Sequence, residues 1–345
     1  MEHRNLGRSG LRVSVLGLGT MLFGETGSRG ASEGVARDQI DRFLDAGGTH
    51  IDTANVYAGG ESESILGRAL EGRRDRVSLA TKVRFRMGDG PNDEGLSRRH
   101  IFASLEASLK RLKTDHVDVL YVHCWDPWTP IEETVHALDD AVRQGMVRYL
   151  GVSNFRAWQL AHARTLQNER RLQPFVAAQY QLSLVERNVD EEFLSLTREL
   201  GIGMVPWGPL GGGFLAGKYN PNEKPSEGAG RIATTPGHAE ESWEKRNQVR
   251  NWHVMELVEK IAGDLNATPS QVALAYLIAR EDVSTVLLGA RTMAQLEDNL
   301  GATQVTLPAD ALTALDEASR VEARYPYRMI DTYGDRAATE ANRVD

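Results

Sequence analysis

The feature that most constrains the fold of this chain is a regular alternation between short apolar runs and longer stretches of helical period. This alternation is typical of parallel β/α units, in which a helix returns the chain to the start of the next strand. Eight apolar runs predict strands at residues 15–19, 50–52, 77–81, 117–122, 147–152, 176–179, 203–207 and 285–288.

The stretches between these runs predict helices at residues 37–46, 62–70, 97–112, 131–144, 156–168, 190–200, 270–279 and 292–300. Ser97 is a capping residue ahead of an apolar stripe, and Gly47 follows the first helix where a left-handed residue is needed. Eight strands that each precede a helix close a (β/α)8 TIM barrel, so we expect one α/β barrel domain over residues 1–345. An open doubly wound sheet is the alternative, and 345 residues would also allow two domains.

Three segments lie outside this repeat. Gly-rich turn chemistry at residues 5–13 predicts a β-hairpin before the first barrel strand. Residues 208–251 carry three successive glycines and prolines at 221, 225 and 236, which predicts a long, partly mobile loop with little internal structure. That loop should border the catalytic face, because loops after barrel strands lie there. Residues 321–345 show no clear period, so a lid, a partner-binding arm and a frayed tail stay open as alternatives.

Charge and composition argue against several classes of function. The chain has 40 Lys and Arg against 48 Asp and Glu, a net charge of −8, and no long basic block, so we expect no nucleic-acid partner. Residues 13–24 have the outline of a signal-peptide core, but glycines interrupt them. No run approaches the ~18 apolar residues of a membrane span, and the single cysteine, Cys124, fits a reducing compartment. We therefore expect a cytoplasmic protein without a membrane partner.

The glycines after the first predicted strand do not indicate a Rossmann dinucleotide site. Gly17-Leu18-Gly19 begins the pattern, but Leu22 stands where the third glycine of G-x-G-x-x-G should be. The next helical stretch starts only near residue 37, so no helix N-terminus follows the turn to hold a diphosphate.

Polar side chains accumulate at the carboxyl ends of three successive predicted strands, where a barrel carries its catalytic groups. They are Asp52 with Tyr57 just beyond it, Lys82 and His123. Each has a structural explanation when taken alone: a turn cap, loop packing, a solvated strand end and a core histidine. Together they place an acid, a phenol, an amine and an imidazole around one axis, which favours a catalytic site.

Such a set suits proton donation to a carbonyl oxygen. A phenol has a pKa of about 10, so Tyr57 would be protonated at neutral pH and able to act as a general acid. The Lys82 ammonium would stabilise the phenolate, and Asp52 would hold that lysine charged and in place. His123 can donate a hydrogen bond to the same oxygen. The set contains no nucleophile with an adjacent base, so acyl transfer is not indicated, and it supplies no source of electrons.

Several runs carry a resemblance to a known family, in the same order and at similar intervals. They are Asp52-Thr53-Ala54-Asn55-Val56-Tyr57, Ala80-Thr81-Lys82, Tyr121-Val122-His123, Gly151-Val152-Ser153-Asn154-Phe155 and Pro206-Trp207-Gly208-Pro209-Leu210. With these runs the chain resembles the aldo-keto reductase superfamily over nearly its whole length. It is most similar to the branch that holds bacterial general reductases and the β subunit of voltage-gated potassium channels.

The resemblance implies a barrel whose base is closed by the N-terminal hairpin, and a hydride supplied by NADPH or NADH. It implies a catalytic tetrad at Asp52, Tyr57, Lys82 and His123. It also implies that Ser153, Asn154 and Gln179 bind the nicotinamide carboxamide and that Trp207 stacks on the ring. The full set of implied cofactor contacts is Gly19, Thr20, Asp52, Ser153, Asn154, Gln179, Trp207, Pro209, Leu210, Gly211, Lys218, Arg231, Gly289, Ala290, Arg291, Gln295 and Asn299.

The chain departs from the family pattern at the adenosine end. Many members carry Lys and Ser at the positions of Gly289 and Ala290, and Arg at that of Gln295, where they bind the 2′-phosphate of NADPH. Arg291 can contact this phosphate, although a surface arginine flanking a helix is its structural alternative. We therefore expect NADPH rather than NADH, without a strict preference. Gly208 stands where Ser is common, so one hydroxyl contact to the diphosphate is missing.

The expected substrate is a small-molecule aldehyde or ketone, and its identity and the oligomeric state stay open. Phe23, Trp125 and Trp128 lie on predicted loops after strands and would form an aromatic wall with Tyr57 and His123. A metal-dependent barrel hydrolase is a rival, but few histidines stand at strand ends and we expect no metal. A cofactor-sensing binding subunit is the rival outside enzymology, because the same tetrad fits both.

Overall fold

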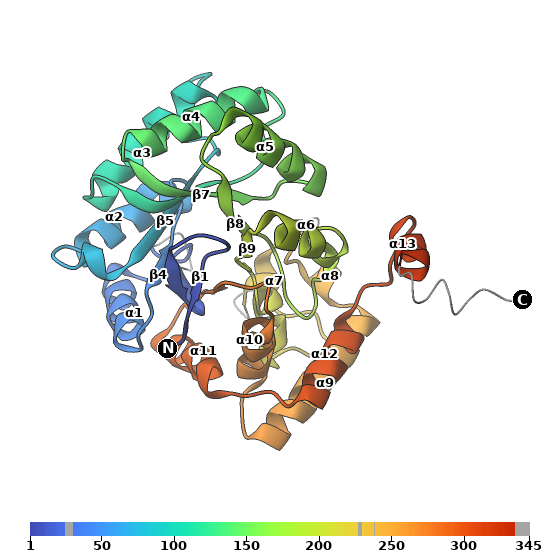
Figure 1. Ribbon diagram of the computed structural model, residues 1–345. Coiled ribbons are helices and arrows are strands. Elements are labelled where there is room, and N and C mark those ends of the chain that lie inside the picture. The colour runs from blue at the N-terminus through green and yellow to red at the C-terminus, as the bar shows by residue number, and fades with distance from the viewer. Residues whose placement is uncertain (25–29, 227–229, 238, 335–345) are drawn as a thin grey trace, which may run out of the picture.

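The computed structural model describes residues 1–24, 30–226, 230–237 and 239–334, and within them eight parallel strands form one sheet (Figure 1). The sheet closes because backbone bonds join its two edges: Ser284 N donates to Met204 O at 2.9 Å, and Leu287 N to Pro206 O at 2.9 Å. The predicted (β/α)8 barrel is thus confirmed. Its strands are β3 (Leu16–Gly19), β4 (His50–Asp52), β5 (Ser78–Val83), β6 (Val117–Val122), β7 (Val147–Ser153), β8 (Phe175–Gln179), β9 (Gly203–Met204) and β10 (Val286–Leu288).

The helices that were predicted between these strands are also present. Ser97 caps α3 by accepting a bond from His100 N, and Gly47 follows α1 with φ 81°. The first helix begins at Glu33 rather than residue 37, because Ser32 caps it by accepting a bond from Val35 N. These helices are α1 (Glu33–Asp45), α2 (Glu61–Ala69), α3 (Arg98–Leu112), α4 (Ile131–Arg143), α5 (Ala157–Arg170), α6 (Phe193–Leu200), α10 (Pro269–Ala279) and α11 (Met293–Gly301).

The predicted N-terminal hairpin is confirmed and packs against the start of the barrel strands. Strands β1 (His3–Asn5) and β2 (Arg12–Ser14) pair antiparallel. Leu6 and Val13 are 0% exposed and pack with apolar residues of the barrel interior. The turn residue Gly7 has φ 57°, and a Cβ there would lie 2.5 Å from Val176 O, so only glycine allows this close approach.

The insertion after β9 has more structure than the Gly and Pro content predicts. It forms a 3-10 segment (Gly211–Ala216) and the short helices α7 (Arg231–Thr234) and α8 (Trp243–Arg246). Its apolar side chains Phe214, Ile232 and Trp243 are buried, which explains why these pieces fold onto the barrel. The expectation of little internal structure was therefore wrong here, while residues 227–229 and 238 of the insertion lie outside the described residues.

Three further helices were not predicted: α9 (Val249–Leu265), α12 (Ala309–Ser319) and α13 (Tyr327–Tyr333). Helices α9 and α12 lie side by side at the edge of the barrel, and α13 stands apart from it (Figure 1). Of the predicted tail, residues 321–334 are described and the remainder is not. No helix in the described parts of the chain is long and apolar enough to cross a membrane.

Candidate active site

The four predicted catalytic residues meet at the carboxyl end of the barrel strands. Asp52 ends β4, and Tyr57 begins the turn beyond it. Lys82 lies near the end of β5, and His123 directly follows β6. Parallel pairing of β4 with β5 and of β5 with β6 places these strand ends side by side. The side chains therefore come together as their positions at strand ends predicted.

Lys82 is the centre of this group, and its ammonium has three acceptors. Nζ donates to Asp52 Oδ1, to Thr53 O at 2.8 Å and to the Tyr57 hydroxyl at 3.1 Å. The Lys82 and Asp52 side chains are 0% and 3% exposed. Burial alone would lower the pKa of Lys82, but the Asp52 carboxylate and the Tyr57 hydroxyl outweigh it, so the pKa is raised. Lys82 is thus a buried cation whose three protons are all bonded.

Tyr57 is held as a protonated phenol against this cation. Burial raises its pKa above the ordinary value of 10, and the Lys82 charge opposes that rise. The turn after Tyr57 runs through the left-handed region, with φ 49° at Ala58 followed by two glycines at positive φ. The hydroxyl therefore carries its proton at neutral pH, and the ammonium beside it can stabilise the anion left when that proton is given away.

His123 lies beside the phenol and is uncharged. Its ring meets the Tyr57 ring edge-on, with centroids 5.9 Å apart, and the Phe85 ring at 4.7 Å. Burial, with a smaller contribution from the Lys82 charge, lowers the pKa of His123 well below 6.5. Nδ1 is buried and has no hydrogen-bond partner. A neutral imidazole can donate one hydrogen bond, which suits a carbonyl oxygen next to Tyr57.

The three residues expected to bind a carboxamide form one connected group. Asn154 Nδ2 donates to Ser153 Oγ and to His123 O, both at 2.9 Å, and Ser153 Oγ donates to Gln179 O at 2.8 Å. Gln179 additionally crosses the barrel: its Nε2 donates to Asp52 Oδ2 at 2.9 Å. This bond to the catalytic carboxylate was not predicted.

The segment expected at the nicotinamide ring and diphosphate follows β9. Trp207 is half-buried, and its backbone N–H donates to Tyr180 O at 2.9 Å. Gly208 and Gly211 have φ values of 65° and 58°, a conformation that favours glycine. Pro209 and Leu210 lie in the turn between them, and Gly211 N donates to Gly208 O at 2.9 Å.

The residues expected at the adenosine end lie between β10 and α11 and on α11 itself. Arg291 is exposed, and its backbone N–H donates to Gln295 Oε1 at 2.8 Å. Gly289 has open space where a Cβ would stand, whereas Ala290 is 3% exposed. Asn299 is 4% exposed, on the buried side of α11. The Gln295 side chain is therefore engaged with the backbone of the arginine beside it.

The insertion carries two of the cations that are expected to bind the cofactor, Lys218 and Arg231. Burial and then the charge of Arg291 lower the pKa of Lys218, so these two side chains lie within electrostatic reach. Neither Lys218 nor Arg291 has a carboxylate partner among the described residues. Arg231 differs, because its Nε pairs with Glu241 at 2.7 Å, and its charge also reaches Tyr57.

At the rim, Gly19 ends β3, and the next residue, Thr20, is buried and bonds both Asp52 O and Ser62.

The structure separates the three aromatic residues expected around the substrate. Trp125 is half-buried and meets the Phe155 ring at 5.0 Å. Trp128 is 89% exposed, whereas Phe23 is 1% exposed and packs in the outer core. Only Trp125 has the intermediate position that a wall residue would need.

Two residues beside the tetrad were missed at the sequence level. Phe85 packs on His123, and Tyr121 is buried within electrostatic reach of Asp52 and Gln179. Tyr121 could have been found from strand alternation, because it points to the same side of β6 as His123 does two positions later. For Phe85 no periodic signal existed, since it follows the strand.

Among the described residues, no group of three or more His, Cys, Asp or Glu side chains is arranged to hold a metal ion.

A closed barrel with a phenol, an ammonium, a carboxylate and an imidazole together at its carboxyl face defines the class of protein: a (β/α)8 barrel with a polar site at the ends of its strands. The family model for the aldo/keto reductase family matches residues 15–320. The chain belongs to the aldo/keto reductase family.

Three curated relatives match nearly full length. The "Uncharacterized oxidoreductase YrpG" of Bacillus subtilis (strain 168) is 38% identical over 328 residues, covering 92% of this chain and 95% of that protein. A "Probable voltage-gated potassium channel subunit beta" is 35% identical in Arabidopsis thaliana and 36% in Oryza sativa subsp. japonica. Each of these two alignments covers 95% of this chain and 98% of the relative.

Proposed function

We propose that this protein reduces an aldehyde or ketone to the alcohol, with NADPH or NADH as hydride source and Tyr57 as general acid. The observation that carries the proposal is the bonding of Lys82, which donates at once to Asp52 and to the Tyr57 hydroxyl. A cation in this place has little value for acyl transfer or hydrolysis, since no nucleophile stands beside it. It has a direct use when a phenol must lose its proton.

The residues divide the chemistry among themselves, and bound NAD(P)H supplies the hydride. Tyr57 gives its hydroxyl proton to the carbonyl oxygen as that oxygen becomes an alkoxide. Lys82 stabilises the phenolate, and Asp52 keeps Lys82 charged and aimed at the phenol. His123, neutral at physiological pH, donates a hydrogen bond to the carbonyl oxygen and orients it. Burial of Lys82 and Asp52 excludes water from this ion pair and strengthens it.

The structure has features that fit an anionic dinucleotide. Lys218 and Arg291 lie within electrostatic reach of each other and have no carboxylate partner among the described residues, so an anion bound between them would relieve their repulsion. Lys218 and Arg291 would bind the phosphates, with Arg291 at a 2′-phosphate, so we propose NADPH as the preferred cofactor. We also propose that the protein acts in the cytoplasm.

A second function is favoured by the names of two relatives. Both plant proteins are called probable voltage-gated potassium channel subunits beta, which makes a cofactor-sensing binding subunit the second candidate. The two functions differ in turnover: a binding subunit would hold cofactor and consume it only at background rate.

The test is a cofactor-depletion screen over a panel of aryl and aliphatic aldehydes and ketones, run with NADPH and with NADH. Tyr57→Phe should lower kcat by about 10²-fold or more, because the proton donor is lost, while cofactor affinity stays within a few-fold. Tyr180→Phe is the matched control, since the Tyr180 hydroxyl accepts from the Phe155 backbone N–H at 3.2 Å and has no other partner in the described parts of the chain. Retention of more than about a tenth of kcat in Tyr57→Phe would refute the general-acid role.

A further inference from the structure

Arg84 is a cation at the mouth of the barrel that the proposed mechanism does not use. It directly follows β5 and is half-buried. Its Nε is buried without a hydrogen-bond partner, and in the described parts of the chain its terminal nitrogens form neither a hydrogen bond nor an ion pair. A buried donor that nothing bonds costs free energy, so the fold itself gives no reason for an arginine at this position.

The Phe85 ring contacts both the Arg84 guanidinium and His123. Arg84 Cζ lies 5.5 Å from the centroid of this ring, which meets the His123 ring edge-on with centroids 4.7 Å apart. The backbones are also adjacent, because His123 N donates to Val83 O at 3.0 Å. Burial raises the pKa of the Cys124 thiol, and the Arg84 charge opposes that rise. The guanidinium therefore lies at the rim of the proposed catalytic site, about one aromatic ring away from His123.

Two carboxylates on neighbouring loops are already committed to other groups. Asp126 lies within electrostatic reach of Arg84, but it is 4% exposed and accepts three hydrogen bonds at 2.7 to 3.0 Å, from Leu96 N, Trp128 N and Thr129 Oγ1. Glu94 pairs with Arg86 at 2.9 Å. The Arg84 guanidinium can therefore pair with an anion that comes from outside the chain.

The position of Arg84 argues against the cofactor phosphates as that anion. In the closed ring of eight strands, β5 lies opposite β9, and β6 lies opposite β10. Lys218 and Arg291, which we propose for the phosphates, belong to the segments that follow β9 and β10. An anion at Arg84 would therefore be part of the substrate.

We propose that Arg84 is a specificity-determining residue that binds a carboxylate of the carbonyl substrate. This inference rests on the proposed function and names its substrate class: an aldehyde joined to a carboxylate by an apolar spacer about the size of the Phe85 ring. A guanidinium binds a carboxylate through two parallel N–H···O bonds, whereas a phosphate dianion would keep one charge unpaired at a single arginine. Because the whole chain has a net charge of −8, an anionic substrate needs such a local cation.

The first test compares two aldehydes of similar size, 4-carboxybenzaldehyde and its methyl ester, in wild type and Arg84→Met. We expect Arg84→Met to raise KM for the carboxylate about twentyfold, in line with the loss of a charged hydrogen-bond pair. The kcat should stay within about twofold, because the lost contact is remote from the reacting atoms. Both constants should stay within about twofold for the ester. Equal losses for the two aldehydes overturn the proposal, as does the absence of a loss for either.

Two further variants and one further substrate sharpen this test. Arg86→Met is the matched control, because Arg86 is an exposed arginine two residues further along that pairs with Glu94. A loss for the carboxylate in Arg86→Met as large as in Arg84→Met overturns the assignment. Arg84→Lys keeps the charge without the paired donors, so it should recover part of the loss. The third substrate is 4-formylphenyl phosphate, and a larger loss for it than for the carboxylate in Arg84→Met overturns the choice of a carboxylate.

A readout independent of turnover separates this proposal from the proposed function. Calorimetry with and without NADP+ measures the Kd of 4-(hydroxymethyl)benzoate, the alcohol that matches the test aldehyde. Wild type should bind it about twentyfold more tightly than Arg84→Met does, and near-UV circular dichroism checks that the variant is folded. Equal Kd values, or no binding to wild type under either condition, overturn the proposal. If wild type reduces no carbonyl yet binds this alcohol through Arg84, the proposed function fails and the carboxylate site stands.

Discussion

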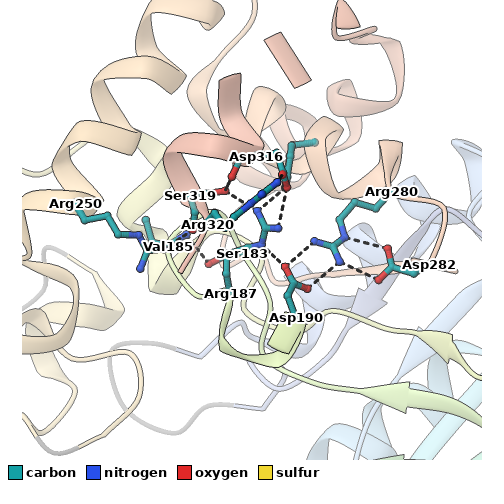
Figure 2. A network of polar contacts seen from close by, with 11 residues as sticks. Ser183, Val185, Arg187, Asp190, Arg250, Arg280, Asp282, Asp316, Ser319 and Arg320 are labelled. Carbon is teal, nitrogen blue, oxygen red and sulfur yellow. Dashed lines mark hydrogen bonds and ion pairs between the residues drawn. The ribbon is translucent and has the colours of Figure 1, made fainter. Parts of the chain in front are cut away.

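Two of the buried charge clusters among the described residues differ in how completely they are hydrogen-bonded. The first is the group around Lys82 at the carboxyl face. The second links the 3-10 turn Asn188–Glu191, the end of α10 and helix α12 through Arg187 and Arg280 (Figure 2).

In the second cluster both arginines use every nitrogen. Arg187 Nε pairs with Asp190, its Nη1 donates to Tyr276 and Ser319 at 2.6 Å each, and its Nη2 donates to Asp316 at 2.9 Å. Arg280 binds Asp190 and Asp282 with two bonds each, at 2.9 to 3.1 Å. This cluster joins three segments far apart in the sequence, and its charges have no capacity left for a ligand.

In the first cluster the inner charges are bonded and the outer groups are not. Lys82 is saturated, but the Tyr121 hydroxyl and His123 Nδ1 are buried without partners. Unbonded buried polar groups cost stability, and a ligand bound at this face could supply their missing partners. The comparison teaches that Arg187 and Arg280 have all their nitrogens engaged in holding segments together, whereas the Lys82 cluster keeps polar groups that a ligand could still bond.

The largest expected effect that would break this comparison comes from Lys82→Met. We expect kcat to fall by about 10³-fold, because the cation that stabilises the phenolate is lost. NADPH affinity, measured by fluorescence titration, should change little, and near-UV circular dichroism checks that the fold is kept. A variant that retains wild-type kcat would place the electrostatic stabilisation elsewhere.

Next in size is Arg187→Met, which should act on stability alone. Removing one partner of a buried ion network leaves carboxylates undercompensated, so we expect the free energy of unfolding in urea to drop by about 3 kcal/mol. The kcat of the folded protein should be unchanged. Arg170→Met, at an exposed arginine of α5, is the control and should alter neither quantity. A tenfold loss of kcat in Arg187→Met would show that saturation does not separate the two clusters.

A smaller effect is expected for Arg291→Ala. This variant removes a cation that has no carboxylate partner among the described residues and that we propose binds the 2′-phosphate of NADPH. NADPH binding should weaken by about tenfold and NADH binding much less, because only NADPH carries the 2′-phosphate. Calorimetric Kd values for both cofactors measure this difference. Equal loss for the two cofactors would make Arg291 an ordinary surface arginine.

The smallest effect concerns acid pH and Asp316. Burial alone would raise its pKa, but bonds from Arg320, Arg187 and Tyr276 lower the pKa to about 2 from 3.8. A lowered carboxyl pKa contributes stability that is present above about pH 4 and is lost as pH falls toward 2. Asp316→Asn should therefore flatten the dependence of the unfolding free energy on pH in this window. Asp310→Asn on the same helix should leave the dependence as in wild type, and an unchanged slope in both variants contradicts the assignment.

Much of the barrel could be predicted because its signals are local. Each strand is a short apolar run. Most helices begin at a capping residue or carry an apolar stripe along one face. The insertion after β9 was less predictable, because Phe214, Ile232 and Trp243 are separated by many polar residues and become one packing surface only on the barrel. Helices α9 and α12 were missed although they pack together, since that contact joins segments far apart in the sequence.

The candidate site shows the same division. Asp52, Lys82 and His123 were found because parallel strands must end at the same face, so positions at strand ends imply proximity. The bond from Gln179 across the barrel to Asp52 had no such signal, because β4 and β8 lie on opposite sides of the ring of strands. Side-chain contacts across the interior depend on the diameter of the barrel and on where small residues leave space for large ones. Gly151 is such a residue, because a Cβ there would collide with the Tyr121 ring.

The amino-acid sequence alone determined the alternation of eight strands with helices and the face that carries the tetrad, because these follow from periodicity and local turn chemistry. Closure of the sheet was decided by the tertiary structure, in which Ser284 N bonds Met204 O and Leu287 N bonds Pro206 O. Only the tertiary structure decided which buried polar groups find partners. Arg187 and Arg280 became saturated because three distant segments supply acceptors around them, and Lys82 became saturated through Asp52, Thr53 and Tyr57. Hydrogen bonding at this level depends on distances of a few tenths of an ångström between strands, which no pattern along the chain encodes.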